Sequence, residues 1–190
     1  MCLHMTASSL KKGEIIMAKL ILLCGIPGSG KSTYAKDCVH TYGGIHISSD
    51  SIRKELYGDE SIQGNPEEVF AMMHKRTVAA IQDGKTVYYD ATNMTRWNRA
   101  SIIAACSELT PIECHIVWQP LNVCIERDAA RACTAGEAVI LKMVKRFQTP
   151  CYNEGFSEIK LVKRNASSYT VTSCRPKDIP NKTPWEKLSQ

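Results

Sequence analysis

The stretch from Gly25 to Ser32 constrains this chain more than any other feature, and it reads Gly-Ile-Pro-Gly-Ser-Gly-Lys-Ser. It fits the pattern GxxxxGK[ST], in which the backbone curls around a phosphate group with its N–H groups turned inward. An apolar run, Lys19 to Cys24, precedes it, and a segment with helical character, Ser32 to His40, follows it. The pattern therefore predicts a strand, a phosphate-binding loop and a helix, and with them a nucleotide-binding site.

The residues of this loop have distinct expected contacts. We expect its backbone to hold the β-phosphate of ATP, Lys31 to reach the β- and γ-phosphates, and the hydroxyl of Ser32 to bind Mg²⁺. The candidate nucleotide-binding residues of the loop are Gly25, Pro27, Gly28, Ser29, Gly30, Lys31, Ser32 and Thr33. The loop predicts ATP and Mg²⁺ as ligands, but it does not choose between a kinase, an ATPase and a switch.

Short apolar runs alternate with longer helical patterns along most of the chain, which is typical of βα units that feed a parallel sheet. Apolar or alternating runs predict strands at residues 19–24, 44–49, 85–93, 112–120, 158–163 and 168–173. Helical periodicity and capping residues predict helices at residues 32–40, 49–58, 66–82, 95–109, 121–132 and 137–147. The sequence therefore predicts an α/β fold with a parallel-stranded central sheet flanked by helices, in which the last two strands can form a hairpin.

Length and composition favour one domain without a membrane span. The chain has 190 residues, of which 44% are hydrophobic and 23% are charged, as in ordinary globular proteins. Its apolar runs are far shorter than the roughly 18 residues needed to cross a bilayer. We expect residues 1–16 to form a flexible extension, residues 17–175 one folded domain and residues 176–190 a tail. No stable protein partner is evident from the sequence.

The nine cysteines include no CxxC pair, and this number and spacing favour free thiols in a reducing compartment over a disulfide framework. We therefore expect a cytoplasmic protein. Cys24, Cys106 and Cys114 lie in apolar patterns and are expected in the core, so thiolate metal sites are not expected. The net charge of +5 permits an anionic partner, but it is by itself a weak argument for nucleic acid.

Two aspartates lie where a nucleotide would bind. Ligands of open α/β sheets bind at the carboxyl ends of the strands, and Asp50 and Asp90 each come at the end of a predicted strand. Asp90 is followed by Thr92 and Asn93, and it fits the acidic position that steadies Mg²⁺ or its water in phosphate-loop enzymes. Asp50 has a second interpretation, because the residue before a helical segment can also be its cap.

Three arginines can meet phosphate charge. Arg127 and Arg131 are four residues apart, so a helix places them on one face, where they can clamp the γ-phosphate of ATP. The alternative is a solvated helix face paired with Glu126 or Asp128. Arg53 lies one helical turn after the first of the two aspartates, and it can hold a phosphate of the acceptor or be a surface residue. The five histidines are scattered and receive no role.

A set of segments in this order, GIPGSGKST, SSDSIRKELYG, YYDATNMTRWNR, ERDAAR and VKRFQTPCYNEGFSEI, resembles the phosphate-loop kinase family of phage-type 5′-hydroxyl polynucleotide kinases. The resemblance covers residues 17–165, and its later segments are more specific than the phosphate loop. It implies a fold of the P-loop NTPase/kinase type with a helical lid. It also implies an ATP-dependent kinase that transfers the γ-phosphate of ATP to the 5′-hydroxyl of a polynucleotide.

The resemblance also implies roles for individual residues. By this resemblance Asp50 is the general base on the acceptor hydroxyl, and Arg53 holds the neighbouring phosphate of the acceptor. Asp90 supports the metal or Arg53, Arg131 clamps the γ-phosphate, and Lys31 completes the catalytic set. The segment after the paired arginines lacks the further arginine and proline that relatives often carry.

Two other functions remain open at this point. The protein can be a kinase of a small hydroxyl metabolite or of a nucleotide sugar, because the same family of folds contains such enzymes. It can also be a non-catalytic switch that binds ATP and a partner. A basic channel that leads to Asp50 would favour a polynucleotide, whereas a closed polar pocket would favour a small molecule.

Overall fold

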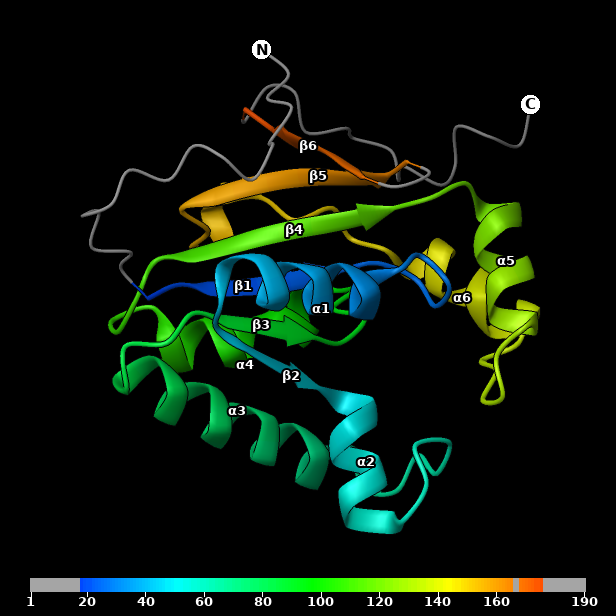
Figure 1. Ribbon diagram of the computed structural model, residues 1–190, viewed down its shortest axis with the longest axis horizontal. Coiled ribbons are helices and arrows are strands. Elements are labelled where there is room, and N and C mark those ends of the chain that lie inside the picture. Colours follow the sequence, from blue (N-terminus) through cyan, green and yellow to red (C-terminus); the bar gives the residue numbers. More distant parts are fainter. Residues whose placement is uncertain (1–17, 166–167, 176–190) are drawn as a thin grey trace.

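The computed structural model of the chain describes residues 18–165 and 168–175 (Figure 1). The expected N-terminal extension, residues 1–16, and the expected tail, residues 176–190, lie outside the described residues. The described strands form one sheet: β1 (Leu20–Cys24), β2 (Ile45–Ser48), β3 (Val87–Asp90), β4 (Ile112–Trp118), β5 (Glu158–Arg164) and β6 (Tyr169–Ser173). Their order is β2-β3-β1-β4-β5-β6. All neighbours pair in parallel except β5 and β6, which form an antiparallel pair. The structure thus confirms the predicted α/β fold.

Helices connect the parallel strands, and Figure 1 shows α2, α5 and α6 beyond the carboxyl ends of the strands. The helices are α1 (Lys31–Tyr42), α2 (Ser49–Tyr57), α3 (Pro66–Gln82), α4 (Arg96–Cys106), α5 (Leu121–Ala129) and α6 (Glu137–Arg146), and a short 3₁₀ helix η1 (Tyr152–Glu154) follows them. In parallel βα units every helix that follows a strand begins at the same edge of the sheet. That edge, the carboxyl edge, therefore collects the first turns of α1, α2, α4 and α5.

Strand β1 lies at the centre of the sheet and is buried on both faces, which explains its uninterrupted apolar sequence. Leu20, Leu22 and Cys24 point into the larger core, to which α3, α4 and α6 contribute. Ile21 and Leu23 point to the other face and pack against α1. The side-chain alternation of a strand thus divides one apolar run between two cores.

Local signals set several helix boundaries. Helix α3 spans the predicted residues, with the Asn65 side chain accepting a hydrogen bond from the Glu67 backbone N–H (3.0 Å) and proline in its first turn. Helix α2 ends at Gly58, whose φ of 82° suits glycine. Three predicted ends were too late by three residues each: β3 ends at Asp90, α4 at Cys106 and α5 at Ala129.

The expectation that three of the cysteines lie in the core agrees with the structure. Cys24, Cys106 and Cys114 are buried in the core, and every cysteine within the described ranges is free. No helix in the described part of the chain is both long and apolar enough to cross a membrane.

A buried ion cluster joins β1, β4 and β5 on the face that α1 covers. The carboxylate of Glu113 accepts hydrogen bonds from Lys19 (2.7 Å) and Lys160 (2.7 Å), and Nε2 of His115 lies 3.1 Å from it. Nδ1 of His115 lies 2.9 Å from the hydroxyl of Tyr34 on α1. Burial opposes the ionisation of Glu113, but hydrogen bonds from His115, Lys160 and Lys19 outweigh it and hold its pKa well below the ordinary value.

We predict that Glu113→Gln lowers the free energy of unfolding by about 1–3 kcal/mol near neutral pH, because it removes the charge that these donors share. The folded-state pKa of Glu113 is lowered, so its contribution is present above the ordinary pKa of 4.5 and is lost as the pH falls towards the folded-state value. Urea unfolding at several pH values measures the difference between parent and variant, which should shrink in acid. Glu108→Gln, at an exposed carboxylate, is the control. A difference that does not change with pH would contradict the prediction.

Candidate functional site

The loop between β1 and α1 carries the predicted phosphate-binding residues. Gly25, Pro27, Gly28 and Ser29 form the loop, Gly30 is the N-cap of α1, and Lys31, Ser32 and Thr33 form the first turn of α1. The N-terminus of α1 therefore faces the space where a phosphate would lie, and its dipole favours an anion there. The hydroxyl of Ser29 is buried and has no hydrogen-bond partner among the described residues. Such a buried unpaired group is expected where a ligand completes the site.

Lys31 is held inside this loop. Its Nζ donates a hydrogen bond to the carbonyl oxygen of Ile26 (3.0 Å), and the side chain is buried. Burial lowers the pKa of Lys31 from its ordinary value, while the nearby carboxylate of Asp90 acts in the opposite direction. A buried ammonium group next to an anion cradle gains much from a phosphate, because the phosphate replaces its lost hydration.

Helix α5 packs so closely on the loop that one position excludes any side chain. A Cβ atom at Gly28, where φ is 76°, would lie 2.1 Å from the carbonyl oxygen of Cys124. Gly30 also has a positive φ, 95°, but a Cβ atom there would meet no atom within 4 Å. The second glycine of the motif therefore serves helix packing, and the third serves the backbone turn alone.

Asp90 lies at the carboxyl end of β3, beside the phosphate loop. Its Oδ2 lies 2.9 Å from Nε2 of His46 on β2, and since a carboxylate only accepts, this nitrogen carries the proton. The hydroxyl of Ser32 lies close to Asp90 and also favours its ionised form, which lowers its pKa. Burial opposes the ionisation of Asp90, but the hydrogen bond from His46 and the charge of Lys31 outweigh it and lower its pKa. Asp90 is therefore a carboxylate that joins β2, β3 and α1.

Asp50 lies in the first turn of α2, and it is not the cap of this helix. The cap is Ser48, whose hydroxyl accepts from the backbone N–H of Ser51 (3.0 Å). The alternative interpretation of Asp50 as a helix cap is therefore wrong. Its carboxylate is 45% exposed and accepts a hydrogen bond from Nη1 of Arg53 (3.0 Å).

Arg53 is largely buried beside Asp50, so the alternative of a surface residue is also wrong. Its side chain is only 12% exposed. Its Nε is buried and has no hydrogen-bond partner within the described part of the chain. A guanidinium group that keeps a donor unpaired next to an accessible carboxylate can receive an anionic ligand.

Arg131 is also near Asp50, but it does not lie on a helix. Its Nη2 is 3.8 Å from Oδ2 of Asp50, and its Nη1 is 3.9 Å from Oδ1 of Asp128. The prediction that Arg127 and Arg131 share one helical face is wrong, because α5 ends at Ala129. The cause is the buried carboxylate of Asp128, which accepts from the backbone N–H groups of residues 135 and 136 and folds the chain back. Arg127 remains exposed in the last turn of α5.

The sequence did not indicate two further groups at this edge, His46 and the pair Arg99 and Glu154. The guanidinium of Arg99 is fully buried and binds both oxygens of Glu154 (2.7 and 2.9 Å), and its Nη1 donates to the carbonyl oxygen of Asn93 (2.9 Å). Asn93 has a positive φ of 49° and a buried Oδ1 without a partner among the described residues. Arg99 and Glu154 both lie in segments on which the family resemblance rests. The two opposite charges in these segments were the one sequence signal that could have indicated the pair. For His46 no local signal existed, because its partner is on another strand.

The donor set at this edge fits Mg²⁺. Across residues 18–165 and 168–175, no group of three or more His, Cys, Asp or Glu side chains could hold a metal ion. A magnesium ion needs fewer protein ligands, because it keeps water and phosphate oxygens in its shell. The hydroxyl of Ser32 and the carboxylate of Asp90, which lie close to one another, are oxygen donors of the preferred kind.

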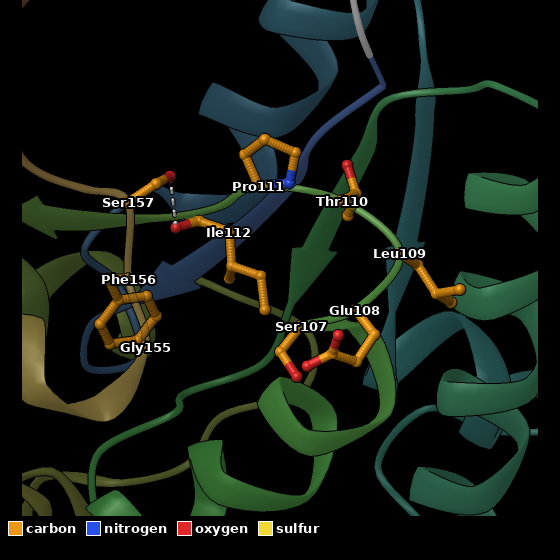
Figure 2. Close-up of a pocket in the computed structure, with 9 residues that line it drawn as sticks. All are labelled: Ser107, Glu108, Leu109, Thr110, Pro111, Ile112, Gly155, Phe156 and Ser157. Carbon is orange, nitrogen blue, oxygen red and sulfur yellow. Dashed lines mark hydrogen bonds between the residues drawn. The ribbon is translucent and has the colours of Figure 1, made fainter.

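A cavity of about 590 Å³ lies elsewhere (Figure 2). It is at the amino end of β4, on the edge of the sheet opposite the phosphate loop, and Glu108 is its single ionisable lining residue. The hydroxyl of Ser157 donates there to the carbonyl oxygen of Ile112 (3.0 Å). This cavity offers no cation for a phosphate, so the chemistry belongs to the carboxyl edge.

Comparison with known proteins identifies a family for this chain. A family model described as an AAA domain matches residues 20–150, which include the phosphate loop, both aspartates and all three candidate arginines. A curated relative, the transcription factor bHLH140 of Arabidopsis thaliana, is 28% identical over 147 residues. The match covers 74% of this chain, and the chain spans only 15% of the length of that relative.

Solved structures share the fold. A chain of the Pnkp1/Rnl/Hen1 complex is 26% identical with a TM-score of 0.54, over 62% of this chain and 41% of that one. A gluconokinase from Sinorhizobium meliloti is 16% identical with a TM-score of 0.55, over 80% and 85% of the two chains. Kti12 of Chaetomium thermophilum, solved with ADP-AlF3, is 18% identical with a TM-score of 0.58, over 78% and 91%. The fold is thus that of P-loop NTPases and kinases, which bind nucleotides.

The two glycines allow a matched test of the loop. We predict that Gly28→Ala and Gly30→Ala both lose about 1–2 kcal/mol of stability from the positive φ. Gly28→Ala should lose about 1–3 kcal/mol more, because its Cβ overlaps the carbonyl of Cys124. Calorimetric unfolding measures both values. Equal losses would show that α5 does not pack on the loop as described.

Proposed function

The chain belongs to the AAA domain family, and from this premise we propose that it is an ATP-dependent phosphotransferase whose acceptor is the 5′-hydroxyl of a polynucleotide. The closer relation to phage-type polynucleotide kinases is part of this proposal. One observation carries it: a carboxylate and a largely buried arginine form a pair at the carboxyl edge, and a buried donor of the arginine has no hydrogen-bond partner among the residues that the structure describes. A hydroxyl next to a phosphate, as at the 5′ end of a nucleic acid strand, needs such a pair of groups.

In the proposed reaction Asp50 accepts the proton of the 5′-hydroxyl while that oxygen attacks the γ-phosphorus of ATP. The bond from this phosphorus to the oxygen that bridges it to the β-phosphate breaks, ADP leaves, and the strand gains a 5′-phosphate. Arg53 orients the acceptor by its neighbouring phosphate. A base must lie within hydrogen-bond reach of the proton that it removes, and an exposed carboxylate in the first turn of α2 is free to do so.

The nucleotide is held by the loop. Its N–H groups and Lys31 bind the β- and γ-phosphates, while Arg131, with Arg127 on the neighbouring helix turn, meets the charge of the transferred group. Mg²⁺ held by Ser32 and supported by Asp90 would neutralise charge on the phosphate oxygens. Positioning and charge stabilisation account for most of the catalysis in phosphoryl transfer. The free thiols support the proposal that the protein works in a reducing compartment such as the cytoplasm.

The proposal is tested by transfer from ATP labelled at the γ-phosphate. We expect transfer to an oligonucleotide with a free 5′-hydroxyl, and Asp50→Asn should lower kcat by about 100-fold or more with little change in ATP affinity, because the amide keeps the shape but not the basicity. Asp83→Asn, at an exposed carboxylate in the pair with Lys85, is the control. Labelling of a free sugar or a nucleoside in preference to the oligonucleotide would assign the protein to small-molecule kinases. Nucleotide binding without any transfer would indicate a switch.

A second variant tests the proposed role of Arg131 at the transferred phosphate. We predict that Arg131→Ala lowers kcat by about 10³-fold and changes ATP affinity far less, because the charge on the transferred group is greatest in the transition state. Steady-state kinetics and nucleotide binding by calorimetry separate the two effects. Arg76→Ala, which removes an exposed arginine paired with Glu55, should leave both unchanged. Small and equal effects of Arg131→Ala on kcat and on binding would contradict the role.

A further inference from the structure

Trp97 is exposed to an unusual degree. Its side chain is 84% exposed, and it lies in the first turn of α4. The residues of α4 that pack into the core lie on another face of the helix: Arg99, Ile102, Ile103 and Cys106. A large aromatic ring in this position contributes little to the fold and is available for contact with another molecule.

The first turn of α4 lies at the carboxyl edge, near the phosphate loop. The segment that leads into it is tied to this loop, because the backbone N–H of Gly25 donates to the carbonyl oxygen of Thr92 (3.1 Å). Trp97 is five residues further along the chain. A polymer whose end reaches the phosphate loop can therefore extend across this turn of α4.

Cationic residues lie next to Trp97 in the sequence and at the neighbouring end of α6. Arg96 precedes Trp97, and the backbone N–H of Arg96 donates to the side chain of Gln148 (2.8 Å). Gln148 follows the last turn of α6, which carries the exposed Lys145 and Arg146. Its own backbone N–H donates to the carbonyl oxygen of residue 94 (2.8 Å), so the end of α6 is fixed beside the start of α4. We call Arg96, Trp97, Lys145 and Arg146 the Trp97 surface.

The carboxylate nearest to this surface does not cancel its charge. Glu154 lies 3.7 Å from Nε of Arg96, but both of its oxygens bind Arg99 at shorter distances, 2.7 and 2.9 Å. One negative charge is thus shared by two guanidinium groups. With Lys145 and Arg146 added, the Trp97 surface keeps a net positive charge around an exposed aromatic face.

We propose that the Trp97 surface binds the single strand of a polynucleotide acceptor beyond its 5′ end, with one base stacked on the indole ring of Trp97 and the strand phosphates on the neighbouring cations. This inference rests on the proposed function and names the substrate as a chain of several nucleotides. Single-stranded nucleic acid presents π faces and phosphates together, and aromatic rings between cations bind both. A duplex is a poorer occupant, because its base faces are hidden inside the stack. An apolar protein surface is also a poorer occupant, because it would make no use of the cations.

Binding is measured first, by fluorescence anisotropy of 3′-labelled oligothymidylate and oligouridylate of about ten nucleotides with free 5′-hydroxyls. Trp97→Ala should weaken binding by roughly fivefold or more, and Trp97→Phe should restore most of it, because phenylalanine keeps a stacking face. Arg146→Gln should reduce the slope of log affinity against log salt by about one. Leu109→Ala, at an exposed apolar residue beyond the opposite end of α4, is the control and should change nothing.

Transfer kinetics separate this inference from the proposed function. Trp97→Ala should raise KM for the long acceptor without a change in kcat, and it should leave a dinucleotide acceptor unaffected. If the oligonucleotide binds in a manner that depends on Trp97 but receives no phosphate, the proposed kinase activity is refuted and the proposed binding role of the Trp97 surface stands. If Trp97→Ala transfers phosphate to the long acceptor with the same KM as the parent, the proposed kinase activity stands and the proposed binding role of the Trp97 surface is refuted. If neither oligonucleotide binds, the proposed binding role of the Trp97 surface is also refuted.

Discussion

The buried ion pair of Arg99 and Glu154 holds together the segments behind the phosphate loop. The guanidinium binds the carboxylate with two hydrogen bonds and the carbonyl of Asn93 with a third, and that carbonyl also accepts from the thiol of Cys24 at the end of β1. The same carboxylate accepts the backbone N–H of Cys151. One pair thus fixes the turn after β3, the start of α4 and the segment before β5. A buried ion pair adds little to the net free energy of folding, because desolvation of the two charges offsets their attraction. It does require a fixed geometry, so its main contribution here is to the shape of the carboxyl edge.

Most charged side chains of the carboxyl edge that we assign to the site are hydrogen-bonded to a protein group in the absence of a ligand. Lys31 donates a hydrogen bond to a backbone carbonyl, Asp90 is hydrogen-bonded to His46, and Arg53 donates to Asp50. These contacts keep each group in position at a distance at which a phosphate or a hydroxyl can replace one partner. Preorganised groups of this kind need little rearrangement during phosphoryl transfer, which is the condition for strong electrostatic stabilisation.

Sequence reasoning was reliable where a signal is local and failed where a contact joins distant segments. The phosphate loop and α3 follow from short patterns, a glycine-rich turn and a proline next to a cap, and both were confirmed. The end of α5 was missed because the carboxylate of Asp128 binds backbone groups of the following loop, which no periodicity reveals. The same holds for His46, whose partner Asp90 lies 44 residues away. The roles of Asp50, Arg53 and Arg131 stay predictions, although the structure brings the three side chains together.

The contact between Arg131 and Asp50 has a thermodynamic consequence. The cation that would serve the nucleotide and the carboxylate that would serve the acceptor neutralise one another at 3.8 Å. A γ-phosphate that attracts the guanidinium releases the carboxylate, and a hydroxyl that engages the carboxylate releases the guanidinium. By linkage, each substrate then increases the affinity for the other by the same factor. In the proposed kinase, this pair would thereby couple the nucleotide half of the site to the acceptor half.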